Sequence, residues 1–190
     1  VSRDWSSDVC SSDLALLAFS VALTIIRLLL LMMHQSRPEA GAFGVACAGV
    51  IYLIALVCVG AAGLSIPANV GPEGTAEYLF WGGGHILQFA NTALMLCSFY
   101  LVSRIALGET PLPPTWFAIA MLLLVAGAAA GPLLYVTYHG GDPSQRMVFT
   151  YLYWFALPAP AALVLLAVVR LLVRRARDVW EGAPEIKGML

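Results

Sequence analysis

The sequence predicts an all-α fold, a polytopic bundle of about five helices that cross a membrane. Of its 190 residues, 61% are hydrophobic and only 11% are charged, and the mean hydropathy is +0.85. Soluble domains typically carry about 25% charged residues. A bilayer core needs about 20 apolar residues per helix, and five stretches of the chain meet that need. The composition therefore excludes an ordinary soluble domain and a disordered chain.

The charge balance excludes a nucleic-acid-binding protein as well. Ten Lys and Arg stand against eleven Asp and Glu, a formal net charge of -1, so no basic surface is available to attract a polyanion. The partner that the composition does imply is the lipid bilayer.

Residues 1–13 differ from everything that follows them. They are rich in Ser and Asp, and apolar sequence begins at Leu14 without a linker. A secretory signal peptide would open with basic residues, which this segment lacks apart from Arg3. The string 3–14 matches the translation of a common sequencing-library adapter. We expect an artefact joined to a truncated reading frame, with further helices upstream, and a natural polar N-terminus is the alternative.

The expected bundle occupies residues 14–173. Each of its spans is a run of about 20 or more apolar residues that ends at polar residues, Gly or Pro. The last span contains Pro158 and Pro160, which free backbone carbonyls and should kink the helix. The expected spans are 14–33, 43–64, 79–107, 116–138 and 147–173.

Lys and Arg predict the orientation, because cytoplasmic loops carry an excess of both. Residues 174–190 form a basic tail that we assign to the cytoplasm, and counting back places the loops with Arg37 and Arg104 on the same side. The two outer loops hold one basic residue between them, Arg146. We expect a multi-pass protein of a bacterial-type inner or plasma membrane with a cytoplasmic C-terminus.

Cysteine usage indicates neither a metal site nor a disulfide. Cys47, Cys58 and Cys97 lie inside apolar stretches without a Cys-x-x-Cys spacing. Small buried hydrophobic side chains are the expected role.

The third expected span opens with polar residues. Polar side chains cost free energy inside a membrane, so a structural or functional role is expected for them. Trp81 suits the outer interface, and His85 follows about 10 Å below the expected helix start. Gln88 and Thr92 share a helix face with His85, so this polar stripe is expected to point into a bundle or cavity.

Three glycines, Gly82, Gly83 and Gly84, stand directly before His85. They would allow a neighbouring helix, or a large planar ligand, to approach the backbone closely. A purely structural role is the alternative, because a membrane His often only hydrogen-bonds a neighbouring helix and glycine runs often only permit packing.

A second histidine, His139, closes the fourth expected span after Tyr138. The predicted topology places His139 and His85 toward the outer face. Two imidazoles at similar depth on adjacent spans are a minimal metal-site candidate. For His139 an interfacial loop position without a ligand is the alternative.

These residues resemble the subunit I family of heme–copper oxidases, which includes cytochrome c oxidase and the large subunit of nitric oxide reductase. The segment from Trp81 to His85 is similar to the one that carries the first ligand of the active-site copper, and Tyr138-His139 stands where the family has a His-His pair. Segments 146–150 and 156–160 are similar to the start and the proline-containing stretch of the following span. The resemblance covers about residues 78–169.

The resemblance implies an oxidoreductase, a membrane subunit of a respiratory oxidase that transfers electrons to oxygen or nitric oxide. A heme would face a copper held by His85 and His139, while the heme's own ligands would come from spans outside this fragment. Other oxidase subunits and an electron donor such as cytochrome c would be its partners. The cofactor-binding residues would be Trp81, Gly82, Gly83, Gly84, Gln88 and Tyr138.

The chain also departs from the family pattern. Phe89 stands where the family commonly has a redox-active Tyr, and a single His replaces the pair. These departures keep a second function open, a non-catalytic membrane scaffold or assembly protein with the same fold. A small-molecule transporter is a third alternative, favoured only by the Pro and Gly breaks in the spans.

Overall fold

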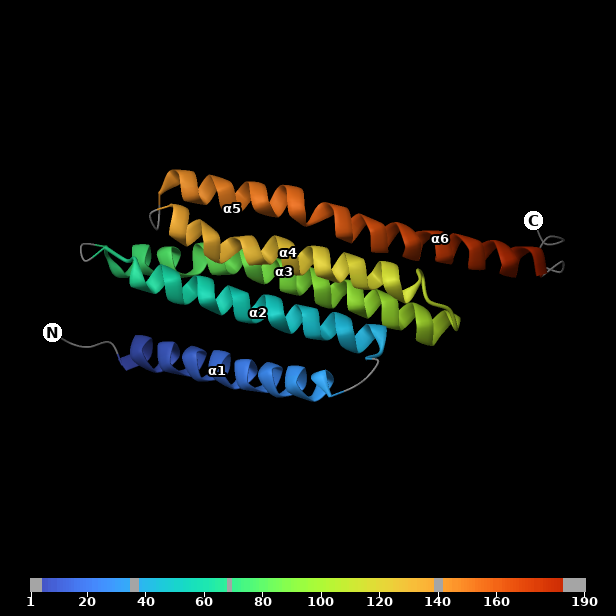
Figure 1. The fold of residues 1–190 in the computed structure, drawn as a ribbon, viewed down its shortest axis with the longest axis horizontal. Helices are drawn as coiled ribbons and strands as arrows, with labels where there is room; N and C mark the ends of the chain where they lie inside the picture. The colour runs from blue at the N-terminus through green and yellow to red at the C-terminus, as the bar shows by residue number, and fades with distance from the viewer. Residues whose placement is uncertain (1–4, 35–37, 68–69, 139–141, 183–190) are drawn as a thin grey trace. The chain divides into compact units, whose positions relative to one another are not determined.

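The computed structural model describes residues 5–34, 38–67, 70–138 and 142–182, and the regular structure in these ranges is helical throughout. The chain divides into two units, Val1–Glu39 with helix α1 and Ala40–Leu190 with helices α2 to α6 (Figure 1). Five segments of the described chain are long and apolar enough to cross a membrane. The predicted all-α transmembrane bundle is confirmed.

Helix α1 (Trp5–Met33) makes up the regular structure of the first unit. It begins at Trp5 rather than at the expected residue 14, so the Ser- and Asp-rich segment continues the apolar helix. The hydroxyl of Thr24 donates to the carbonyl of Ser20 at 2.9 Å, which satisfies this polar group within the helix. The origin that we expect for residues 1–13 stays a prediction.

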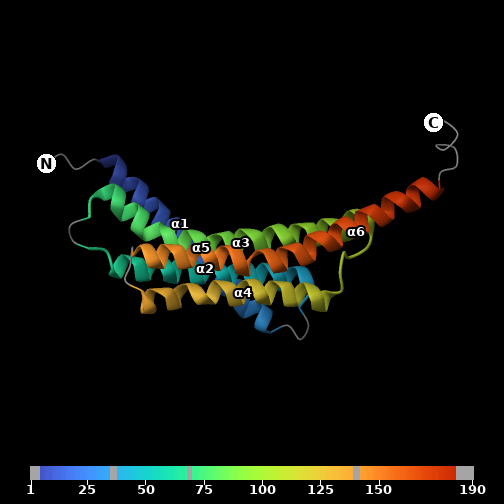
Figure 2. The ribbon, with the colours of Figure 1, turned by 90° about the horizontal axis from the view of Figure 1, so that it is seen from above.

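Three helices that lie side by side form the centre of the second unit (Figures 1 and 2). They are α2 (Ala40–Leu64), α3 (Pro72–Leu107) and α4 (Pro114–Thr137). Both α3 and α4 start earlier than expected because a proline occupies their first turn, where no backbone N–H is needed. Gly108 ends α3 with φ 71°, a left-handed conformation that glycine adopts without strain.

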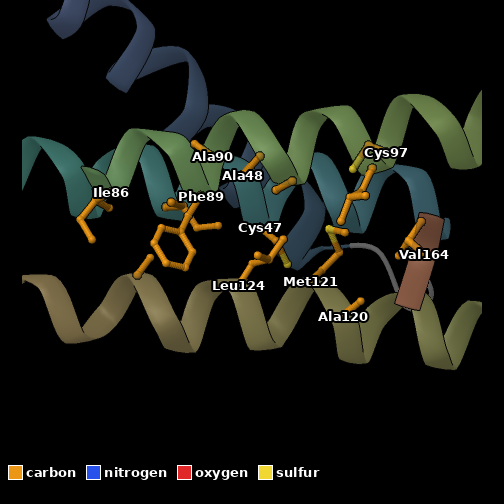
Figure 3. Close-up of a cluster of buried hydrophobic side chains, with 14 of the residues drawn as sticks. Cys47, Ala48, Ile86, Phe89, Ala90, Cys97, Ala120, Met121, Leu124 and Val164 are labelled. Carbon is orange, nitrogen blue, oxygen red and sulfur yellow. The ribbon is translucent and has the colours of Figure 1, made fainter. Parts of the chain in front are cut away.

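The core of this unit combines small residues of α2 with larger side chains of α3 and α4. Phe89 extends from α3 toward α4 and is completely buried (Figure 3). Close packing of this kind holds helices together in lipid, where apolar surface alone supplies no attraction between them. The cysteines Cys47, Cys58 and Cys97 are buried and free, as expected. The buried positions of α2 include Gly41, Gly44, Ala48, Ile51, Ala55, Cys58 and Ala62.

The last expected span consists of two helices, α5 (Pro143–Ala156) and α6 (Pro158–Gly182). The break at Leu157, directly before Pro158, confirms that a proline interrupts this span. Helix α6 runs beyond the ends of its neighbours (Figure 2) and passes the expected end at residue 173. The expectation was too short because it took the end of the apolar run for the end of the helix.

Ion pairs join helices at both ends of the second unit. At one end, Arg146 of α5 lies 2.5 Å from Glu77 of α3. At the other end, Glu109 accepts hydrogen bonds from Arg174 and Arg175 of α6. Arg175 also donates to the carbonyl of Leu107 at 3.0 Å, which satisfies a backbone group at the C-terminal end of α3.

Candidate functional site

His85 lies on the side of α3 that faces α5. The centroid of its ring is 6.2 Å from that of Phe149 and 6.5 Å from that of Tyr153, both on α5. Because α3 begins at Pro72, His85 stands about 20 Å along the helix, roughly twice the expected depth from the helix start. The imidazole is therefore half-buried between two helices among aromatic rings.

The backbone of α3 fixes the tautomer of His85. Its Nδ1 lies 2.7 Å from the carbonyl oxygen of Trp81, one helical turn earlier. A carbonyl can only accept, so Nδ1 donates and the lone pair of the neutral ring is left on Nε2. Metal-ligating histidines are held in this manner, with the second nitrogen donating to a carbonyl. The arrangement leaves Nε2 able to bind a metal or accept a proton.

Trp81 connects His85 to the charged end of the unit. Its ring centroid is 5.1 Å from that of His85, and the guanidinium carbon of Arg146 also lies 5.1 Å from the Trp81 ring. Arg146 in turn pairs with Glu77. An ion pair, a cation–π contact and an imidazole therefore follow one another along the α3–α5 contact. The interfacial role expected for Trp81 stays a prediction.

The three glycines before His85 have different surroundings. A Cβ at Gly82 would overlap the Tyr135 hydroxyl and lie 2.8 Å from Cζ of Phe149. A Cβ at Gly83 would lie 2.5 Å from a methyl group of Val59. A Cβ at Gly84 would meet nothing within 4 Å. Two of the glycines thus permit close helix packing, one of the two roles expected for them, and the third faces open space.

Only part of the polar stripe points into the bundle. Gln88 is exposed, although Thr92 and His85 are half-buried. The expectation is wrong for Gln88 because the helical repeat directs Ile86 and Phe89 into the core and turns Gln88 away from it. Nothing in the sequence of α3 alone reveals which side its neighbours occupy.

The second expected copper ligand, His139, lies outside the described residues. Tyr138, directly before it, ends α4 and donates its backbone N–H to Leu134 at 3.0 Å. Within the described ranges no group of three or more His, Cys, Asp or Glu could hold a metal ion. Of the two histidines expected to hold copper, the described residues include one, His85.

Sequence reasoning missed the α5 side of the site. Phe149 and Tyr153 stand four residues apart on α5 and so face α3 together, and Gln145 is buried one turn before Phe149. The i, i+4 aromatic spacing was a usable signal. The Glu77–Arg146 pair could also have been anticipated, because both residues were expected at the outer side of the membrane.

No protein-family model, curated protein or solved structure matches the chain.

Proposed function

We propose that the chain is a membrane-embedded part of a heme–copper-type respiratory oxidase, in which His85 supplies one copper ligand. The observation that carries the proposal is the hydrogen bond from Nδ1 of His85 to the Trp81 carbonyl, which leaves Nε2 as the free lone pair. This geometry occurs in the segment that resembles the copper-ligand motif. Neutral imidazole is a suitable copper ligand.

The described residues fit the expected copper only in part. His85 is one ligand, whereas a tri-histidine centre needs two more, and in the proposal His139 and spans outside this chain provide them. Heme and copper would together supply electron transfer to oxygen or nitric oxide. The residues of this chain would orient the imidazole through the Trp81 carbonyl and exclude water with the rings of Phe149 and Tyr153.

The proposal also includes an orientation and partners. The end of the second unit that carries Arg174 and Arg175 would lie in the cytoplasm of a bacterial-type cell, following the excess of basic residues there. Other oxidase subunits would complete the bundle, and a donor such as cytochrome c would deliver electrons. His85 would then occupy the outer half of the membrane.

A non-catalytic scaffold or assembly protein is the second candidate function. Two observations favour it. Phe89, at the position of the family's redox-active Tyr, is completely buried in the helix core. Gly82 and Gly83 are closely approached by side chains of the chain itself, which leaves no room there for a planar ligand. In this case the ring of His85 is simply a satisfied polar group between α3 and α5.

Metal analysis of the native complex separates the two candidates. His34 is a matched control for His85, because its Nδ1 also lies near the carbonyl four residues earlier, at 2.8 Å from Leu30. We expect the complex purified from its own membranes to contain copper and heme, His85→Ala to lose more than nine tenths of the copper, and His34→Ala to keep it. Equal copper in the two variants would reject the ligand assignment. A complex without heme and copper would favour the scaffold.

A further inference from the structure

Besides its core-facing side, helix α3 has an exposed side with a regular residue spacing. Its residues follow one another at alternating spacings of four and three. The side chains along it are exposed, and a Cβ at Gly84, its half-buried first member, would meet nothing within 4 Å. We call this face the α3 stripe, and it consists of Gly84, Gln88, Asn91, Met95, Ser98, Val102 and Ile105.

The polar members of the α3 stripe lie well inside the candidate span Gly74–Leu107. Ser98 is satisfied locally, since its hydroxyl donates to the carbonyl of Leu94 at 2.9 Å. Gln88 and Asn91 have no hydrogen-bond partner among the described residues. A carboxamide that faces hydrocarbon without a partner is costly, so a polar partner is needed at this depth.

The exposed face of α4 lacks this feature. The exposed positions of α4 between residues 119 and 136 are apolar throughout, as contact with lipid requires. The difference marks the α3 stripe as a surface for a protein partner rather than for acyl chains.

We propose that the α3 stripe is the contact surface of a homodimer, in which α3 of a second copy packs against it in parallel. A carboxamide both donates and accepts, so Gln88 and Asn91 each find a matching group at the same depth in a second copy. Two copies inserted with one topology are necessarily parallel. A second copy of α3 therefore offers a matching group to both amides.

The spacing of the α3 stripe supports this partner. Alternating steps of four and three are the heptad repeat, which produces a left-handed pair of helices crossing at about +20°. Polar residues within a heptad seam fix the register of the two helices. Gly84 and Ser98 are small, which lets the two backbones approach closely. The α3 stripe shares Gly84 and Gln88 with the cofactor-binding residues that the resemblance implies. The dimer is argued from exposure and spacing, uses no copper ligand and does not depend on the proposed function.

Cysteine cross-linking of the full chain in native membranes tests the dimer. Ser98→Cys places a thiol in the α3 stripe, and Ala126→Cys places one on the exposed apolar face of α4 as a matched control. Both are made with Cys10→Ser, while the buried Cys47, Cys58 and Cys97 remain. Iodine, which enters the bilayer, oxidises two neighbouring thiols to a disulfide.

We expect a disulfide-linked band of twice the chain mass for Ser98→Cys and none for Ala126→Cys. Adding Gln88→Leu and Asn91→Leu should lower the cross-linked fraction about tenfold, because the paired amides are lost. Three results would overturn the proposal: no dimer band for Ser98→Cys, the same band for both cysteines, or a Ser98→Cys band whose second component is another protein. An unchanged yield after the two Leu substitutions would refute the role of the amides.

Discussion

The two faces of α3 show what distinguishes a buried helix face from an exposed one in a membrane protein. The inner face packs Phe89 and its neighbours against glycines and alanines of α2 and α4. The outer face carries two carboxamides with no partner among the described residues. Hydrophobicity alone does not distinguish the inner face of α3 from the outer face, because lipid is as apolar as the core. Close packing and hydrogen-bond pairing make the difference.

The largest expected loss of stability comes from removing a large side chain from the inner face of α3. Phe89→Ala should lower the free energy of unfolding by about 3–5 kcal/mol, because the site is completely enclosed and the cavity cannot collapse fully. Phe80→Ala is the control on the same helix, since Phe80 is 56% exposed. Its effect should stay within about 0.5 kcal/mol. Titration with a denaturing detergent in mixed micelles measures both, and equal losses would contradict the assignment of the two faces.

A smaller change in stability is expected when a methyl group is added to a glycine on either face of α3. Gly82→Ala should destabilise the fold by about 1–2 kcal/mol, because the new methyl group displaces the rings of Tyr135 and Phe149. Gly84→Ala should be neutral or stabilise by up to about 1 kcal/mol, because the methyl group enters open space and alanine favours the helix.

The same titration measures this pair, at protein dilutions that keep the chain monomeric. Destabilisation by Gly84→Ala as large as that by Gly82→Ala would show that the outer side of α3 is already covered.

Much of this architecture could be predicted from the sequence. Run length and hydropathy predicted the spans, and Pro158 predicted the interruption of the last one. The helix starts at Pro72 and Pro114 were missed, because those prolines lie in polar or breaker-rich stretches where the apolar run has not yet begun. Hydropathy measures burial in lipid, whereas a helix continues wherever its backbone hydrogen bonds can form.

The candidate site was predictable only on one helix. The motif from Trp81 to His85 identified the imidazole, but its aromatic neighbours come from α5, and their approach depends on packing that the sequence of α3 does not encode. The direction of Gln88 was misjudged for the same reason. Helix periodicity predicts which residues share a face, and only the neighbouring helices decide which face is inside.

The smallest expected effect concerns the two ends of α3. Glu109 pairs with two arginines of α6, one of which also binds the Leu107 carbonyl. Among the residues that the structure describes, Glu77 pairs only with Arg146. Glu109→Gln should therefore cost up to about 1 kcal/mol and Glu77→Gln less than about 0.5 kcal/mol, because both carboxylates are at least 40% exposed and screened by solvent. High salt should reduce both losses, since it screens surface ion pairs. A loss at Glu109 that does not change with salt would indicate that the hydrogen bonds of the arginines, rather than their charges, hold α6 to the end of α3.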